Sequence, residues 1–281
     1  MADQPLTVEQ LQAYLAWLLP LAQAAGNAAK VIYDNAQAHP DGAKSALVQH
    51  KEDQSPLTEA DLAAHRLIIE ALRYRTPAMV VISEESFQPD QMRSAGSRFW
   101  LVDPLDGTKE FLSGTGEFTV NIALIENRQP VLGVVYQPTT HEMFWGGSAL
   151  GSYRRVGDAV PQRIAVSPSQ HPPWRVLASR SHLGPHTQAL IKRMGQTQLL
   201  QAGSSLKFCR IASGLADFYP RLGFTSQWDT AAGQAVLEGA GGYVIDSAGR
   251  SLRYGQTDII NPHFLASAVE PANVRHWWPG Q

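Results

Sequence analysis

The 281-residue chain contains a single cysteine, Cys209, and few charged residues. One cysteine excludes both an internal disulfide and a cysteine metal cluster, and it fits a reducing compartment. Charged residues make up 17% of the chain, with 23 basic and 25 acidic side chains and a formal net charge of −2. This balance excludes the broad basic surface of a nucleic-acid-binding protein. Positive charge for an anionic ligand must therefore come from local side chains or from metal ions.

Long apolar runs are also missing. The most apolar early stretch, residues 11–25, contains Gln12, Pro20 and Gln23, so it is too short and too polar for a membrane span. The first residues show neither a secretory signal pattern nor a basic amphipathic anchor. With 44% hydrophobic residues, the chain can instead bury a large core. At this length, one core usually divides into two subdomains.

Apolar periodicity and capping signals predict three helices in the first quarter of the chain. Two helices are expected over residues 8–19 and 20–33, because the proline between them cannot continue a helix but suits the first turn of a new one. Thr58 followed by Asp61 is a capping-box signal for a helix over residues 59–74. The apolar stripe of each run predicts a packing face.

Short apolar runs predict strands further along the chain. Buried strands are expected at residues 79–82 and 99–102, and each ends directly in acidic residues. Residues 118–126 and 131–136 predict an antiparallel hairpin, because a turn-like segment separates two strand patterns. The glycine-rich passage 146–157 is interpreted as a subdomain junction.

The remaining chain predicts an α/β half, with a strand at 176–179 and a helix at 206–213. We therefore expect an N-terminal α+β subdomain over residues 1–150 that carries most of the metal ligands. A C-terminal α/β subdomain over residues 151–281 is expected to carry the last ligand and the substrate contacts.

A group of polar residues at predicted element ends carries the candidate chemistry. Taken singly, each has an ordinary structural explanation, such as a capping box, a solvated strand end or a helix cap. Their coincidence weakens those explanations. The candidates are Asp61, Glu84, Glu85, Asp103, Asp106, Thr108 and Asp229.

The segment 100–108 brings two of these carboxylates together. A buried strand runs into a turn with proline and glycine, which can place Asp103 and Asp106 on one side. Two close carboxylates repel each other unless a cation lies between them. Oxygen ligands suit Mg²⁺ or Mn²⁺ better than zinc, and the carbonyl of Leu105 is a candidate further ligand.

Several carboxylates suit the hydrolysis of a phosphate monoester. That reaction needs a hydroxide-like nucleophile at neutral pH and stabilisation of charge on the departing oxygen, and paired metal ions can supply both. A carboxylate hydrogen-bonded to a threonine hydroxyl can orient the attacking water and accept its proton. The residues therefore indicate a Mg²⁺-dependent phosphatase acting on a small anionic metabolite.

Three motifs resemble the inositol monophosphatase superfamily of lithium-sensitive phosphatases, in that family's order and spacing. The resemblance covers about residues 20–265, and it implies an alternating αβαβα layered sandwich of the sugar-phosphatase type. The motifs are Ser83-Glu84-Glu85-Ser86, Asp103-Pro104-Leu105-Asp106-Gly107-Thr108 and Trp228-Asp229-Thr230-Ala231-Ala232-Gly233.

The resemblance implies a role for each matching position. Two or three Mg²⁺ ions per active site are implied, with Mn²⁺ as a substitute. Asp61 and Thr108 would form the water-activating pair, and Glu85 would support catalysis behind the metal ligands. Lys51 would lie near the metals or the phosphate, although it also fits a solvated surface lysine. The implied metal ligands are Glu84, Asp103, the carbonyl of Leu105, Asp106 and Asp229.

Further stretches are similar to the bacterial CysQ-type 3′(2′),5′-bisphosphate nucleotidases. That family removes the 3′-phosphate of adenosine 3′,5′-bisphosphate, a by-product of sulfate assimilation, to give AMP and phosphate. The resemblance also implies action on 3′-phosphoadenylyl sulfate. The alternative within the same class is an inositol or other sugar monophosphate phosphatase. The stretches are residues 109–111, 116–123, 179–182, 203–209 and 219–221.

Substrate contacts are expected from both halves of the chain. From the residues alone, 203–205 offers backbone N–H groups and two hydroxyls ahead of a helix, with Lys207 nearby, as a cradle for a second phosphate or a ribose. Residues 113–115 depart from the family pattern, because basic residues are common there in the nucleotidases. The predicted contacts are Lys51, Asp106, Gly107, Thr108, Ser181, His182, Gly203, Ser204, Lys207, Arg221 and Asp229.

A hypothesis from another class is a catalytically silent nucleotide-binding regulator that retains the fold. The presence of every expected ligand type argues against it. The resemblance implies a cytoplasmic protein. Peripheral contact with the inner membrane face and the choice between monomer and homodimer are left open by the sequence.

Overall fold

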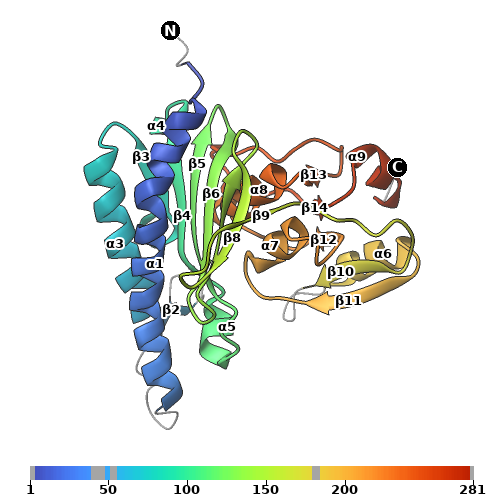
Figure 1. Ribbon diagram of the computed structural model, residues 1–281, viewed down its shortest axis with the longest axis horizontal. Helices are drawn as coiled ribbons and strands as arrows, with labels where there is room; N and C mark the ends of the chain where they lie inside the picture. Colours follow the sequence, from blue (N-terminus) through green and yellow to red (C-terminus); the bar gives the residue numbers. More distant parts are fainter. Residues whose placement is uncertain (1–3, 39–47, 51–55, 179–183, 279–281) are drawn as a thin grey trace.

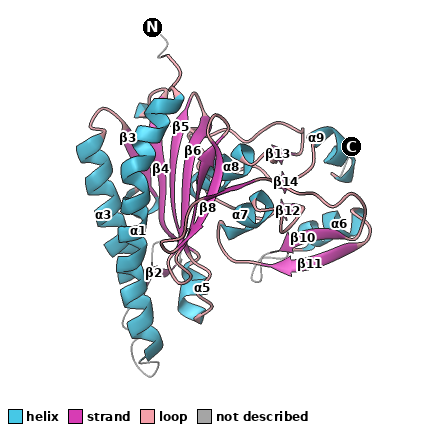
Figure 2. Ribbon diagram, viewed as in Figure 1, coloured by secondary structure: helices cyan, strands magenta, loops and turns pink. Residues whose placement is uncertain are grey.

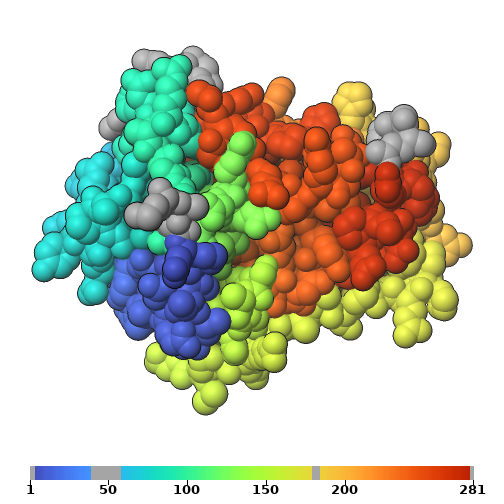
Figure 3. Space-filling model, turned by 90° about the horizontal axis from the view of Figure 1, so that it is seen from above, coloured from blue at the N-terminus to red at the C-terminus, as the bar shows by residue number. Residues whose placement is uncertain are grey.

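The computed structural model describes residues 4–38, 48–50, 56–178 and 184–278 (Figure 1). The two larger of its three described sheets alternate with three helical layers, in the order helices, sheet, helices, sheet, helices (Figure 2). In the space-filling view, the green strands of the first sheet separate the blue and cyan helices from the orange and red C-terminal part (Figure 3). The alternating αβαβα sandwich expected from the sequence is confirmed.

A seven-stranded sheet forms the first β layer. β3 and β4 are parallel, and every later pair is antiparallel. The central strands β4, β5 and β7 are buried along nearly their whole length, because a helical layer covers each face of the sheet. The strands follow one another in chain order: β3 (Val80–Ser83), β4 (Arg98–Asp106), β5 (Thr119–Glu126), β6 (Gln129–Gln137), β7 (Glu142–Gly147), β8 (Gly151–Val156) and β9 (Gln162–Ile164).

The outer face of this sheet is covered by α1 (Val8–Ala38) and α3 (Glu59–Arg75), which lie side by side in Figure 1. The capping box predicted for α3 is confirmed: the Asp61 carboxylate accepts from the Thr58 N–H at 2.8 Å, and the Asp61 N–H donates to the Thr58 hydroxyl at 3.4 Å. The predicted break of the first helix at Pro20 is wrong, because α1 runs through that residue.

Packing explains why α1 continues through its proline. Leu18 and Ala22 flank the position and are fully buried, so one apolar stripe extends across it. Ala16, whose carbonyl loses its helical donor to the proline ring, is exposed, as is Pro20. Water can therefore bind the freed carbonyl, and tertiary packing outweighs the local preference.

The inner face of the first sheet carries α8 (Gln227–Gly239), with α7 (Leu206–Ala212) beside it. α8 approaches the sheet so closely that a Cβ at Gly133 on β6 would collide with the backbone of Ala232. Glycine is required at this position because no side chain fits between helix and strand. This contact fixes α8, and the acidic residue in its first turn, against the first sheet.

The second sheet has five strands and packs on α7 and α8. α6 (Pro185–Arg193) and α9 (Pro271–Val274) cover its far side, around a core that includes Phe218 and Trp277. The strand order is β11 (Thr197–Gln201), β10 (Trp174–Ala178), β12 (Phe218–Arg221), β14 (Phe264–Ser267) and β13 (Tyr243–Asp246). Shorter elements are β1 (Val48–His50), β2 (Pro56–Thr58), η1 (Glu84–Ser86), α4 (Pro89–Ser94), α5 (Thr108–Ser113) and η2 (Arg275–Trp277).

Several strand predictions agree with these bounds, including the antiparallel pairing of β5 and β6. The glycine-rich passage 146–157, interpreted as a junction, instead lies in the β7–β8 hairpin, and the first sheet continues to Ile164. The division of the chain near residue 150 stays a prediction. Within the described residues, no helix is both long and apolar enough to span a membrane.

We expect Pro20→Ala to stabilise the protein, because alanine restores the helical hydrogen bond and removes the clash of the ring with the preceding turn. The expected gain in the free energy of unfolding is about 1–3 kcal/mol. Urea denaturation followed by circular dichroism measures it. Gln12→Ala, at another exposed position of α1, is the matched control and should change little. An unchanged or lower midpoint for Pro20→Ala would contradict this account.

Candidate active site

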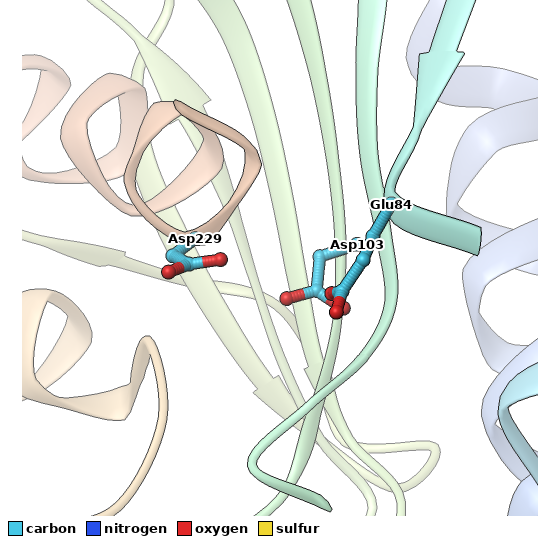
Figure 4. Close-up of side chains that lie close together, drawn as sticks. All are labelled: Glu84, Asp103 and Asp229. Carbon is cyan, nitrogen blue, oxygen red and sulfur yellow. The ribbon is translucent and has the colours of Figure 1, made fainter. Parts of the chain in front are cut away.

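Three carboxylates from separate elements converge at the junction of the two halves. One ligand oxygen from each of Glu84, Asp103 and Asp229 lies within 4.8 Å of the other two (Figure 4). Glu84 follows β3 in η1, Asp103 lies on β4, and Asp229 lies in the first turn of α8. Glu84 and Asp103 come close because β3 and β4 are parallel neighbours that reach the same edge of the sheet.

The turn after Asp103 has the role expected from its proline and glycine. The strand pairing shifts register between Asp103 and Asp106, which re-aims the chain at the sheet edge. The N–H of Leu105 donates to the Asp103 Oδ1 at 3.0 Å and holds that carboxylate in place. The side chain of Leu105 is buried in an apolar cluster with Phe111 and Phe118, which anchors the turn.

Asp229 is fixed by its own helix. It is the third residue of α8, where its Oδ2 accepts from the N–H of Ser226 at 2.9 Å in a capping box. The side chain of Gln227 bonds the backbone of Gly255 and Asp258, each at 2.7 Å, and so ties the next loop to the helix start. These bonds fix the direction of the carboxylate toward the β4 edge.

Asp106 lies beside the group of three and is linked to it through Ser205. Its Oδ2 accepts from the Ser205 N–H at 2.7 Å and from the Asn121 side chain at 3.2 Å. The Ser205 hydroxyl donates to the carbonyl of Asp229 at 2.7 Å. Through Ser205, these hydrogen bonds join the turn after Asp103 to the first turn of α8.

Crowding and burial make this cluster electrostatically costly in the absence of a cation. Burial, followed by the charges of Glu84 and the other nearby carboxylates, raises the pKa of Asp103 well above its usual range. Burial and then Asp106 do the same to the pKa of Asp229. Three converging carboxylates, with no histidine or cysteine in the cluster among the described residues, fit a hard divalent cation.

Residues 203–205 form a joint between the two halves. The Gly203 N–H donates to the Glu117 carboxylate at 2.8 Å, and the Ser204 hydroxyl lies 2.8 Å from the carbonyl of Asp106. Gly107 has a left-handed φ of 94°, and a Cβ there would also collide with the Ser204 hydroxyl. Donors predicted to cradle a phosphate therefore bind protein groups, and the loop positions Asp106.

Lys207, like residues 203–205, donates hydrogen bonds to groups of the protein itself. Its ammonium donates to the carbonyls of Ser204 at 2.6 Å and Ala202 at 3.4 Å, and it lies 5.1 Å from the centre of the Tyr219 ring. Burial, opposed by the charge of Asp106, lowers the pKa of Lys207 to about 8. Its side chain borders the pocket, but two of its donors are already used within the protein.

Asp61 and Thr108, the predicted water-activating pair, lie on α3 and α5, and both of these helices contact β2. Asp61 is 1% exposed, and its Oδ2 also accepts a short hydrogen bond from the Thr58 hydroxyl. Thr108 opens α5, which packs against β2, and the last residue of β2 is Thr58. The pairing of Asp61 with Thr108 across a water molecule stays a prediction.

The carboxylates open into a cavity of about 230 Å³. Arg221, on β12, borders it and donates from Nη2 to the carbonyl of Phe224 at 2.9 Å. Its Nε atom is buried and lacks a hydrogen-bond partner among the described residues. The lining comprises Glu84, Asp106, Gly107, Thr108, Lys109, Glu110, Ser204, Lys207, Phe208, Tyr219, Arg221, Thr225, Asp229 and Thr230.

Three predicted substrate residues, Lys51, Ser181 and His182, lie outside the described residues. The sequence indicates no separate role for Asn121 and predicts Ser205 only as part of a phosphate or ribose cradle, whereas both residues hold Asp106. Asn121 is a buried amide in an otherwise apolar strand, and that pattern is a usable signal, since buried polar groups need partners.

A layered αβαβα sandwich with converging acidic residues defines the class of metal-dependent phosphatases. Comparison with known proteins agrees: the model of the inositol monophosphatase family matches residues 11–276. The chain therefore belongs to the inositol monophosphatase family.

Named relatives narrow the comparison. The 3′(2′),5′-bisphosphate nucleotidase CysQ of Salmonella typhimurium is 44% identical over 245 residues, covering 87% of this chain and 95% of the relative. The crystal structure of CysQ from Bacteroides thetaiotaomicron superposes with a TM-score of 0.75 at 37% identity, covering 89% of this chain and 95% of that one. An inositol monophosphatase structure from Anabaena gives a TM-score of 0.73 at 25% identity, with 96% of each chain covered.

We expect Asp103→Asn to stabilise the metal-free protein, because it removes one negative charge from a buried repulsive cluster. Since the folded-state pKa of Asp103 is raised, its protonated form favours folding at low pH, and that stability is lost as the pH rises through the folded value. The midpoint of thermal unfolding in EDTA should therefore rise more at pH 8 than at pH 5.

Mg²⁺ should stabilise the wild type much more than Asp103→Asn. At a concentration 100 times its dissociation constant, the ion should stabilise the wild type by about 2.7 kcal/mol, and Asp103→Asn should lose most of this gain. Asp158→Asn, an exposed acidic position between β8 and β9, is the control. A lower midpoint for Asp103→Asn in EDTA at pH 8 would show that repulsion does not dominate the cluster.

Proposed function

We propose that this protein is a Mg²⁺-dependent 3′(2′),5′-bisphosphate nucleotidase that removes the 3′-phosphate of adenosine 3′,5′-bisphosphate to give AMP and phosphate. The observation that carries the proposal is the convergence of Glu84, Asp103 and Asp229 beside a pocket with a partly unpaired arginine. The 44% identity to CysQ nucleotidases over most of the chain supports this substrate class. 3′-Phosphoadenylyl sulfate, which has the same 3′-phosphate, is the second expected substrate.

The carboxylates divide the work at the reacting phosphate. Glu84, Asp103, Asp106 and Asp229 would hold the metal, with the carbonyl of Leu105 as a further ligand. Bound Mg²⁺ supplies a nucleophile at neutral pH and stabilises charge on the departing oxygen. The number of ions, a role for Mn²⁺ and inhibition by lithium stay predictions.

Asp61 and Thr108 would orient the water that attacks the phosphorus, and Asp61 would accept its proton. Burial and the capping bonds at Thr58 hold the Asp61 carboxylate in one orientation, which suits a general base. Glu85, whose charge acts on Asp103, would support the ligands from behind. The 3′-oxygen of the ribose leaves as the phosphorus–oxygen bond breaks.

The second phosphate distinguishes a bisphosphate nucleotide from an inositol monophosphate. Arg221 suits this anion, because its buried Nε can still donate a charge-assisted hydrogen bond. Lys207 suits it less well, since its ammonium holds the carbonyls of Ala202 and Ser204. We therefore assign the 5′-phosphate, or the sulfated phosphate, to Arg221.

A substrate panel tests the proposed function. Phosphate release should be fastest with adenosine 3′,5′-bisphosphate, slower with inositol 1-phosphate and fructose 1,6-bisphosphate, and abolished by EDTA. A preference for inositol 1-phosphate would favour the alternative, a sugar monophosphate phosphatase. Tight nucleotide binding without metal-dependent release would favour a silent regulator.

Substitution of the two basic side chains, Arg221 and Lys207, tests the assignment of the second phosphate. We expect Arg221→Ala to raise KM for adenosine 3′,5′-bisphosphate by about 10- to 100-fold, as for the loss of a hydrogen bond to a charged group. KM for inositol 1-phosphate should change by less than about threefold. Lys207→Met, which removes the charge from a joint, should instead reduce turnover of both substrates together. Equal effects of Arg221→Ala on both substrates would contradict the assignment.

A further inference from the structure

The site pocket is too small for a whole nucleotide. Its volume is about 230 Å³, whereas pockets that enclose a drug-sized ligand occupy roughly 300–1,000 Å³. The reacting phosphate, the metal ions and part of the ribose fill such a space. Because the pocket is open to solvent, the base of a bound nucleotide can extend past this recess onto the surface at its rim.

The loop that follows Arg221 carries an exposed aromatic side chain, Phe224. Phe224 is 83% exposed, a large fraction for a phenylalanine, and it lies in the loop between β12 and α8. The pocket-lining residues Arg221 and Thr225 flank it in the chain. Its carbonyl accepts the hydrogen bond from the Arg221 guanidinium at 2.9 Å, so the loop and the proposed second-phosphate contact are directly joined.

A second apolar side chain lies close to this loop. Ile260 pairs with Ser226 in an antiparallel bridge, and the N–H of Asn261 donates to the carbonyl of Thr225 at 2.8 Å. Ile260 is 39% exposed. The side chain of Asn261 bonds the carbonyl of Ser226 at 2.6 Å. The loop that carries Phe224 is therefore held at a defined place beside the pocket.

We propose that Phe224 is the platform on which the adenine base of the substrate stacks. This inference rests on the proposed function and deepens it. In a β-nucleoside the base and the 5′-carbon lie on the same face of the ribose, opposite the 3′-oxygen. A substrate with its 3′-phosphate at the carboxylates and its 5′-phosphate at Arg221 thus directs its base toward the loop that holds Arg221.

Stacking on an exposed ring has a specific consequence for substrate choice. Every base has a π face, so the platform favours nucleotides over inositol and sugar phosphates without selecting strongly among purines. It acts on binding, because the ring does not touch the reacting atoms. Phe224 is therefore a specificity-determining residue, and its loss should appear in KM with little change in kcat.

Three substitutions at this position separate stacking from apolar contact. Phe224→Ala should raise KM for adenosine 3′,5′-bisphosphate about 5- to 150-fold, the range of one lost base–aromatic stack, while kcat stays within about twofold. Phe224→Trp should keep KM close to the wild-type value, because tryptophan also stacks on the base. Phe224→Leu should raise KM, because leucine offers apolar contact without a ring. Val160→Ala, at another 83% exposed apolar residue remote in sequence on the β8–β9 connection, is the matched control and should leave KM unchanged.

Product inhibition provides a readout that a general structural defect would not reproduce. Phe224→Ala should raise the inhibition constant of AMP, which has the base, by the same factor as KM. The inhibition constant of inorganic phosphate, which has no base, should stay the same. Equal shifts for both products, or an unchanged KM in an active Phe224→Ala enzyme, would overturn the platform. Failure of the wild type to hydrolyse the nucleotide would instead refute the proposed function.

Discussion

The candidate site depends on how the fold holds together carboxylates that repel one another. Glu84, Asp103 and Asp229 come from three elements, and backbone N–H groups hold the carboxylates of Asp103 and Asp229. Parallel β3 and β4 set the first two, and the first turn of α8 sets the third. Burial raises the free energy of the charged, metal-free cluster. A divalent ion bound among the carboxylates would lower it by neutralising their repulsion.

Bringing α8 to the sheet edge requires agreement between the two halves of the chain. Gly133 allows the helix to lie against β6, and Gly107 allows the metal-site turn to lie against Ser204. Asp106 and Ser205 then tie the turn to the helix start. Small residues thus permit the approach and hydrogen bonds fix it, so the site is part of the joint between layers.

Local signals in the sequence were sufficient for much of the fold and of the acidic site. The capping pair Thr58 and Asp61, the strand ends before Glu84 and Asp103, and the family motifs each depend on neighbouring residues, and the layered fold is confirmed. Long-range packing could not be predicted from the sequence. For example, α1 continues through Pro20 because Leu18 and Ala22 on either side are buried. Residues 203–205 donate to Glu117 and Asp106, which lie 86 and 99 residues away in the chain, and no local pattern indicates such distant partners.

Asp61 and Asp229 share one further property, since each is also the third residue of its helix and closes a capping box. In both, one carboxylate oxygen already accepts a backbone N–H at the helix start. The rotamers of these acids are therefore frozen when the chain folds, and little conformational entropy is left to lose on ligand binding. In the proposed function, preorganisation of the site would thus follow from capping two helices at their N-termini, and a substitution at either position would change helix stability and ligand affinity together.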